Sequence, residues 1–248
     1  MIDSKDLPRY VGEEYILQFI RWMTPYREDV STPVLEHCRG DNVPILSEET
    51  KSLLAVLLQM KMPTRILEIG TAYGFSAIFM SQFLKDGGLI HTIERNPVMI
   101  EQARRHIEAA GLAGTITLYE GHAQEILKSL TGPYDMVLMD ASMGQYGIFW
   151  EEIQPFLSPG AWVMADNVLH GGMVARPRLE VPRRQRTIHS RLRSFLETVL
   201  QDERYQTSLL PIGDGVLLAV RKGEKKNEKT GIAGSCRRTK SASSLYFH

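Results

Sequence analysis

The sequence predicts an α/β protein with a doubly wound parallel sheet of seven strands, helices on both faces and a C-terminal antiparallel hairpin. Between residues 65 and 166, short apolar runs alternate with segments of helical periodicity, a pattern typical of parallel sheets. The first apolar run stops at a loop with two glycines, residues 70–74. Two closing apolar runs flank Pro-Ile-Gly-Asp at residues 211–214, which predicts a hairpin turn.

The composition limits the classes of function. The chain has 248 residues, 43% hydrophobic and 23% charged, enough to bury one sizeable core. Its net charge is zero, but the segment from Lys222 onward holds seven basic and two acidic residues, so the preceding part is about five charges negative. This balance excludes attraction of the whole body to nucleic acid and leaves only a local basic patch for that purpose.

No apolar run approaches the ~20 residues of a membrane span, and the N-terminus lacks the apolar core of a signal peptide. We therefore expect no membrane partner and a cytoplasmic location. Cys38 and Cys236 are expected to be free thiols in a reducing compartment.

The first sixty residues predict a helical cap. Apolar residues at helical spacing indicate a helix over residues 13–23, and a shorter one follows over residues 30–36. Ser47 is a suitable N-cap, with Glu48 and Glu49 in the first turn, for a helix through residue 60. The first helix could cap the sheet or form an oligomer face, and the sequence alone does not choose.

Residues 61–221 predict the main domain, and residues 222–248 predict a disordered basic tail because they lack apolar periodicity. The predicted strands are residues 65–68, 89–94, 115–119, 134–140, 161–166, 206–210 and 215–221. The predicted helices are residues 75–84, 97–110, 123–130, 148–157 and 182–200, the last after a long loop.

The glycine loop and the end of the second strand predict a nucleoside-like ligand. Parallel sheets bind ligands at the carboxyl ends of their strands, and glycine lets the ligand approach the backbone closely. Gly70 and Gly74 make a G-x-x-x-G loop rather than the G-x-G-x-x-G that seats a pyrophosphate, and Glu94 is placed to accept hydrogen bonds from a ribose. This combination suits S-adenosylmethionine (SAM). The alternative interpretation is that Gly70 only forms a tight turn and that Glu94 is a solvated residue at a strand end.

Three oxygen-bearing side chains at two further strand ends predict a magnesium site. Asp140 ends the fourth strand, and Asp166 and Asn167 end the fifth. Oxygen ligands without Cys or His suit Mg²⁺, which could hold two substrate oxygens and lower the pKa of a hydroxyl group. Alternatively, Asp166 and Asn167 begin a turn while Asp140 caps the next helix.

With these motifs in view, the chain resembles the class I metal-dependent O-methyltransferases, which include catechol and caffeoyl-CoA O-methyltransferases. The resemblance runs over residues 43–221 and includes LEIGTAYGFSA, TIERNPVMIEQAR, YDMVLMDASMGQY, PGAWVMADNVLHGGMVA and PIGDGVLLAVRK. Within that family it most resembles the bacterial tRNA 5-hydroxyuridine methyltransferases, which make 5-methoxyuridine at the wobble position. The DNVLHGGMVA run and the arginine-rich PRRQR that follows support this closer likeness.

The resemblance implies a Rossmann-like SAM-methyltransferase fold, a homodimer and a set of site residues. Asp140, Asp166 and Asn167 would bind Mg²⁺, with Asp140 the metal-assisted catalytic residue. The expected SAM site consists of Leu46, Glu68, Gly70, Ser76, Glu94, Gly121, His122 and Asp140.

Two positions depart from the family pattern. His122 stands where an aspartate is common, and Met143 stands where many members carry a lysine that is the usual candidate for the general base. Methionine cannot accept a proton, so the chain needs another base or none. A 5-hydroxyuridine hydroxyl is more acidic than a simple phenol, and metal coordination could then suffice.

An arginine-rich stretch follows the predicted metal ligands and predicts contact with RNA. It contains Arg176, Arg178, Arg183, Arg184, Arg186, Arg191 and Arg193, of which Arg176, Arg183, Arg184 and Arg186 are the expected contacts. These side chains could grip the phosphates of a tRNA anticodon loop, while an aromatic residue stacks on its splayed base. The aromatic candidates are Tyr146, Phe149, Trp150 and His170. The alternative is a solvated helix face whose arginine stems cover apolar surface.

The leading hypothesis is thus Mg²⁺-assisted methylation of wobble 5-hydroxyuridine. The second is the same chemistry on a small catechol-like phenol, and the third is a nucleoside-binding or dehydrogenase module without methyl transfer.

Overall fold

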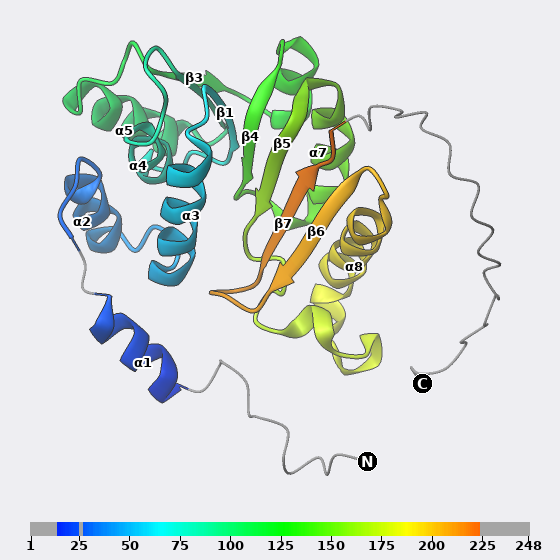
Figure 1. Cartoon of the computed structure of the whole chain (residues 1–248). Helices are drawn as coiled ribbons and strands as arrows, with labels where there is room; N and C mark the ends of the chain where they lie inside the picture. The colour runs from blue at the N-terminus through cyan, green and yellow to red at the C-terminus, as the bar shows by residue number, and fades with distance from the viewer. Residues whose placement is uncertain (1–13, 25–26, 224–248) are drawn as a thin grey trace, which may run out of the picture.

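The computed structural model describes residues 14–24 and 27–223, and within them seven strands form one sheet (Figure 1). The order is β3-β2-β1-β4-β5-β7-β6. The strands are β1 (Arg65–Ile69), β2 (Leu89–Glu94), β3 (Ile116–Glu120), β4 (Tyr134–Met139), β5 (Leu157–Ala165), β6 (Tyr205–Leu210) and β7 (Val216–Arg221). The first five are parallel, whereas β7 pairs antiparallel with β5 and β6. The predicted doubly wound sheet with a closing hairpin is confirmed.

The chain reverses direction across the sheet between β1 and β4. From β1 it moves outward to β2 and β3, and it then returns to β4 on the other side of β1. At such a switch point, the connections that follow the two central strands leave in opposite directions and open a crevice at the carboxyl edge. The ligand site is therefore expected between the ends of β1 and β4.

Helices cover both faces of the sheet. The described residues form the helices α1 (Glu14–Met23), α2 (Thr32–Gly40), α3 (Glu48–Lys61), α4 (Phe75–Ser81), α5 (Pro97–Ala109), α6 (Ala123–Ile126), α7 (Tyr146–Ile153) and α8 (Arg186–Gln201). Figure 1 shows α3, α4 and α5 on one side of the sheet and α7 and α8 on the other. The predicted N-cap of α3 is confirmed, because the Ser47 hydroxyl accepts a hydrogen bond from the Thr50 backbone N–H at 3.1 Å.

Each face of the sheet has its own apolar core, as the alternation of side chains along β4 shows. Met136 and Leu138 pack in the core formed with α2, α3 and α4, whereas Val137 and Met139 pack in the core formed with α7 and α8. Successive side chains of a strand point to opposite faces, so a strand buried on both faces must be apolar throughout. This explains the uninterrupted apolar run before Asp140.

Several boundaries differ from those predicted. Helix α8 begins at Arg186 rather than residue 182, because Pro182 is extended and a 3₁₀ turn (Arg183–Gln185) intervenes. Strand β5 begins at Leu157 rather than residue 161, since Leu157 pairs with Tyr134 across an irregularity in the ladder. Helix α6 has four residues and continues as a 3₁₀ turn. These shifts follow from tertiary pairing and proline geometry, which periodicity does not detect.

Some predictions fall on residues that the structure does not describe. The predicted tail lies outside the described residues from position 224 onward, and so does Cys236. Cys38 is a buried free thiol, and burial raises its pKa to about 11. Helices α2 and α3 share a core with the sheet, while the domain division at residue 61 stays a prediction. Among the described helices, none is both long and apolar enough for a membrane span.

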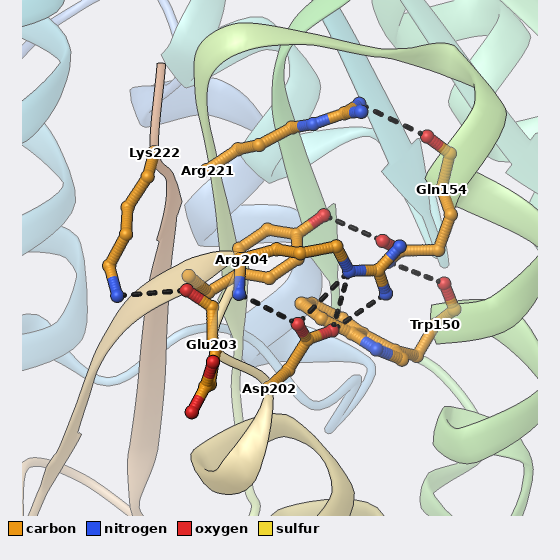
Figure 2. A network of polar contacts seen from close by, with 8 residues as sticks. Trp150, Gln154, Asp202, Glu203, Arg204, Arg221 and Lys222 are labelled. Carbon is orange, nitrogen blue, oxygen red and sulfur yellow. Dashed lines mark hydrogen bonds and ion pairs between the residues drawn. The ribbon is translucent and has the colours of Figure 1, made fainter. Parts of the chain in front are cut away.

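A polar network fastens the closing hairpin to the segment after α7 (Figure 2). Arg221, the last residue of β7, donates hydrogen bonds to the carbonyl oxygens of Leu157 at 2.6 Å and Gln154 at 3.3 Å. The Tyr205 hydroxyl donates to Gln154 Oε1 at 2.7 Å, and Gln154 Nε2 donates to the Trp150 carbonyl at 2.9 Å. The network joins β6 and β7 to the α7 side of the sheet.

Replacing Arg221 by methionine is expected to lower the free energy of unfolding by about 1–3 kcal/mol, because two partly buried carbonyls lose a charged donor. The control is Arg204→Met. Arg204 pairs with Asp202 at the surface, and such pairs contribute less than about 1 kcal/mol. Urea unfolding of both variants measures the difference, and an equal loss in the two would contradict this role of Arg221.

Candidate active site

The predicted glycine loop brings the backbone of β1 against the end of β4. Gly70 has φ +106°, and an added Cβ would lie 1.9 Å from the carbonyl oxygen of Asp140. The Gly70 N–H donates to Ile93 O at 3.0 Å, and the Asp140 N–H donates to Ile69 O at 3.0 Å. Glycine is therefore required at position 70 by conformation and by space. The chain then enters α4 after Gly74, as the strand–turn–helix pattern predicts.

The carboxylate of Glu94 closes the loop from the side of β2. Its Oε2 accepts a hydrogen bond from the Ala72 N–H at 2.9 Å, and its Oε1 accepts from the N–H groups of Arg95 and Asn96 at 2.8 and 2.9 Å. These contacts fix the orientation of the Glu94 side chain at the edge of the sheet. A carboxylate has further lone pairs, so it can still accept hydrogen bonds from ribose hydroxyls.

Glu68 lies beneath the loop rather than in its wall. Its side chain is fully buried, and its Oε2 accepts a hydrogen bond from the Thr92 hydroxyl at 2.5 Å. Burial raises the pKa of Glu68 to about 7. Among the described residues, its Oε1 atom has no hydrogen-bond partner. Glu68 therefore supports the loop from below. It does not line either of the two cavities at this edge of the sheet.

Two adjoining cavities lie over the switch point, with volumes of about 560 and 350 Å³. Seven of the eight residues predicted for the SAM site line them. Gly70 and Asp140 border both. The larger is also lined by Glu94, Gly121 and His122, and the smaller by Leu46 and Ser76. The structure thus brings together side chains that lie far apart in the sequence.

Asp140 and Asp166 follow paired residues of β4 and β5 and therefore lie side by side. The Asp166 N–H donates to Met139 O at 3.0 Å, and the Tyr146 hydroxyl donates to the carbonyls of Met139 and Asp166 at 3.1 and 3.0 Å. Burial raises the pKa of Asp140 to about 7, and the charge of Asp166 adds to this rise. Burial also raises the pKa of Asp166 to about 6, with the charge of Asp214 adding to it.

This carboxylate pair fits a divalent cation. Asp166 is buried and Asp140 partly buried, and two such carboxylates are stabilised in their charged forms when a cation lies between them. Asp166 Oδ1 is buried and has no hydrogen-bond partner among the described residues. Asn167, in the left-handed conformation with φ +59°, lines the smaller cavity together with Asp140. The described residues contain no group of three His, Cys, Asp or Glu suited to a metal, and the predicted set instead uses two carboxylates and an amide.

Met143, at the position of the common family lysine, also lines the smaller cavity. It begins a 3₁₀ turn (Met143–Gln145) and packs against the core below α7 and α8. Its thioether leaves this wall of the cavity without a proton acceptor.

The predicted RNA contacts differ in their surroundings. Arg176, Arg183 and Arg184 are exposed, and no ion pair between described residues involves them. Arg186 is partly buried and donates to the carbonyls of Val181 at 2.9 Å and Leu179 at 3.1 Å. Its first role is therefore to brace the turn before α8, which removes the expectation of a free guanidinium there.

Two of the four aromatic candidates for base stacking are wrong. Tyr146 and Trp150 are buried in the core beneath the sheet and present no ring to a ligand. Phe149 is 2% exposed but borders the larger cavity. His170 lines a separate hollow of about 480 Å³ with Arg176, Gln185 and Asp214. The inward face of α7 was not distinguished from its outward face because its apolar residues nearly encircle the helix.

Sequence reasoning missed several residues at the site. Pro44, Ala72 and Met99 border both cavities, and Ser142 and Gln145 border the larger one. Arg191 was included in the predicted arginine-rich stretch, and its Nη1 atom lies 3.4 Å from Gly144 O in the turn Met143–Gln145. Pro44 lies in an irregular segment before α3 and carries no motif. Only its position near Leu46, a predicted site residue, could have drawn attention to it.

A sequence model of the O-methyltransferase family matches residues 34–222 of this chain. The chain belongs to this family. It is an S-adenosylmethionine-dependent O-methyltransferase of the catechol and caffeoyl-CoA type, which confirms the family indicated by the motifs and sets aside the dehydrogenase hypothesis.

Named relatives agree with this membership. The chain is similar to the catechol O-methyltransferase of Niastella koreensis, with 29% identity over 167 residues that cover 65% of this chain and 76% of the relative. The O-methyltransferase of Bacillus cereus, solved in complex with SAH, has 25% identity and a TM-score of 0.74, covering 84% of this chain and 97% of its own. TomG of Streptomyces achromogenes, solved with SAM and involved in tomaymycin synthesis, has 26% identity and a TM-score of 0.73, covering 84% and 96%.

Proposed function

We propose that this O-methyltransferase methylates the 5-hydroxyl group of the wobble uridine in tRNA, with SAM as methyl donor and Mg²⁺ assisting. The substrate would be the anticodon loop, from which a splayed base can enter an enzyme pocket. The observation that carries the choice of RNA is the exposure of Arg176, Arg183 and Arg184, which follow the predicted metal ligands in the sequence and enter no ion pair among the described residues.

The cofactor would lie along the carboxyl edge of β1 and β2. The bare backbone at Gly70 permits close approach, and Glu94 would accept hydrogen bonds from the two ribose hydroxyls. Gly121 and His122 border the same cavity and would flank the adenine. SAM supplies an electrophilic methyl group on a sulfonium sulfur.

Asp140, Asp166 and Asn167 would hold Mg²⁺ at the ends of β4 and β5. When bound, the metal would orient neighbouring substrate oxygens and favour the ionised hydroxyl. The reaction forms a C–O bond to the uridine oxygen and breaks the bond from the methyl carbon to sulfur, while the hydroxyl proton leaves to solvent. The protein's part is chiefly to align the oxygen, the methyl carbon and the sulfur. Met143 is compatible with this scheme because an acidic hydroxyl needs no protein base.

The arginines support RNA as the acceptor through their position. Arg176 and His170 line the same hollow, and His170 follows Asn167 by three positions in the chain. Arg191 on α8 contacts the turn that follows Asp140. Guanidinium groups at this rim can bind backbone phosphates and so position a nucleotide, whatever its neighbouring sequence.

A small catechol-like phenol is the alternative acceptor. It is favoured by the likeness to the Niastella koreensis catechol O-methyltransferase, and the metal site would serve a catechol equally well. The two functions differ in what lies beyond the reacting ring. A free phenol needs no arginines, whereas tRNA binding depends on them.

The decisive comparison uses purified protein with Mg²⁺ and SAM carrying a labelled methyl group. We expect transfer to tRNA that contains 5-hydroxyuridine and little to free catechol. Replacing Arg183 and Arg184 together by alanine should raise the KM for tRNA about tenfold. The slope of log K against log salt concentration should fall by about two, because each lost phosphate contact releases roughly one counterion fewer. The affinity for SAM should stay unchanged.

The matched control replaces Arg104 and Arg105 on α5. These two are also adjacent and exposed, but they pair with Glu101 and Glu120. Their loss should leave tRNA binding within about twofold of the wild type. Turnover of catechol together with salt-independent tRNA binding would remove the RNA proposal in favour of the alternative.

We also infer a cytoplasmic homodimer. Helix α1 exposes Tyr15, Phe19 and Trp22, and an exposed apolar face of this kind is typical of a protein interface. The α1 helix is tied to α3 by the ion pair of Arg21 and Glu49 at 2.7 Å. We predict that this face of α1 forms the dimer interface. The oligomeric state of α1 variants tests this prediction.

A further inference from the structure

The loop that carries Asn167 has an unusual backbone. Asn167 and His170 have φ angles of +59° and +45°, and Gly171 and Gly172 follow with +64° and +72°. Positive φ costs a non-glycine residue on the order of 1 kcal/mol or more, so such a loop persists only when its surroundings hold it. The contacts of this loop therefore determine where Asn167, a proposed metal ligand, lies.

Those contacts come largely from the turn between β6 and β7. The Val168 N–H donates to Gly215 O at 3.0 Å, and the Leu169 N–H donates to Asp214 O at 2.9 Å. The Asp214 carboxylate then accepts a hydrogen bond from the Gly171 N–H through Oδ1. Asp214 thus holds the loop at two points on either side of His170.

The glycines beside Asp214 let the turn fit into this space. An added Cβ at Gly215 would lie 2.3 Å from Leu169 Cγ, and one at Gly213 would lie 2.8 Å from the hydroxyl oxygens of Ser47 and Thr50. Both glycines also have positive φ. The turn therefore lies against the start of α3 on one side and the Asn167 loop on the other.

We infer that Asp214 is a positioning residue of this O-methyltransferase: its carboxylate fixes the Asn167–His170 loop, and through it the metal ligand Asn167. The inference rests on the proposed metal site, but not on the choice of tRNA as acceptor. Asp214 also borders the hollow that contains His170 and Arg176, on the proposed RNA-binding side.

An ordinary hairpin turn would not explain the side-chain contact. The turn itself is closed by the Gly215 N–H, which donates to Ile212 O at 2.9 Å and needs no carboxylate. The Asp214 carboxylate is instead directed at Gly171, 43 positions earlier in the chain. A hydrogen bond to a charged acceptor is about twice as strong as a neutral one, and it is suited to holding a strained loop.

The test compares Asp214→Ala and Asp214→Asn with the wild type. MgCl₂ is titrated into the SAM-bound protein by calorimetry, and amide hydrogen exchange is followed at Gly171. For Asp214→Ala we expect the Mg²⁺ affinity to fall about 10- to 100-fold, the range for residues that orient metal ligands, and exchange at Gly171 to quicken about tenfold or more. Asp214→Asn keeps an acceptor oxygen and should restore most of both properties. SAM affinity should stay within twofold.

Asp86→Ala is the matched control, because Asp86 is an exposed turn aspartate followed by glycine before β2, at the other edge of the sheet. It should change neither readout. The inference is overturned if Asp214→Ala leaves exchange at Gly171 unchanged, or if SAM binding and Mg²⁺ binding weaken together, which would indicate a general loss of structure. If the wild type binds no Mg²⁺, the proposed metal site fails, and exchange at Gly171 still decides whether Asp214 holds the loop.

Discussion

Replacing Asp140 by asparagine is expected to slow methyl transfer about 10²- to 10³-fold, the usual effect of removing one electrostatic contact to the reacting centre. Asp140 lines both cavities and adjoins Asp166, so in the proposed function it would contact both the cofactor and the metal. The amide keeps the shape of the side chain but removes its charge. Initial rates at saturating SAM measure the effect.

The same substitution should not destabilise the metal-free protein. The pKa of Asp140 is raised in the folded state, so the ionised carboxylate opposes folding at pH 8, above the value of about 7. Asparagine removes that opposition, and the melting temperature at pH 8 should stay equal or rise. Asp86→Asn serves as the control with full activity. If the melting temperature fell so far that unfolding accounted for the lost rate, Asp140 would have a structural role instead.

The second large effect is expected from Gly70→Ala. The new Cβ would overlap the Asp140 carbonyl oxygen, and backbone atoms at that contact cannot turn away. Positive φ adds strain, so the free energy of unfolding should fall by about 2–5 kcal/mol. SAM affinity should fall as well, since the ends of β1 and β4 line the two cavities that are proposed to hold the cofactor. Urea unfolding and calorimetry with SAM measure the two effects.

Gly87→Ala separates backbone strain from collision. Gly87 also has a positive φ, +74°, but an added Cβ there meets no atom within 4 Å. Its substitution should cost only about 1 kcal/mol and leave SAM binding unchanged. Equal losses in the two variants would show that strain alone is responsible and that the contact with Asp140 does not matter.

The sequence was sufficient for the parts of the site that lie at strand ends. Apolar runs of five or six residues locate β1 and β4, and parallel pairing brings whatever follows them to one edge. Gly70, Asp140 and Asp166 could therefore be placed near one another without a structure. Glu94 could be placed because β2 pairs with β1.

Residues that reach the site through loops could not be placed in this way. Asp214 lies in a turn whose sequence indicates only a hairpin, and its contact with Gly171 depends on how β7 pairs with β5. Arg186 carries the same charge as its neighbours, yet its guanidinium is used by two backbone carbonyls. Periodicity assigns elements, but the direction of an individual side chain depends on tertiary packing.

The most direct test is nucleoside mass spectrometry of tRNA from cells that make 5-hydroxyuridine but lack their own methyltransferase for it. Expression of the wild-type chain should convert 5-hydroxyuridine to 5-methoxyuridine, whereas expression of Asp140→Asn should leave the precursor in place. Unchanged 5-hydroxyuridine in cells that contain the folded wild-type protein would contradict the proposed function.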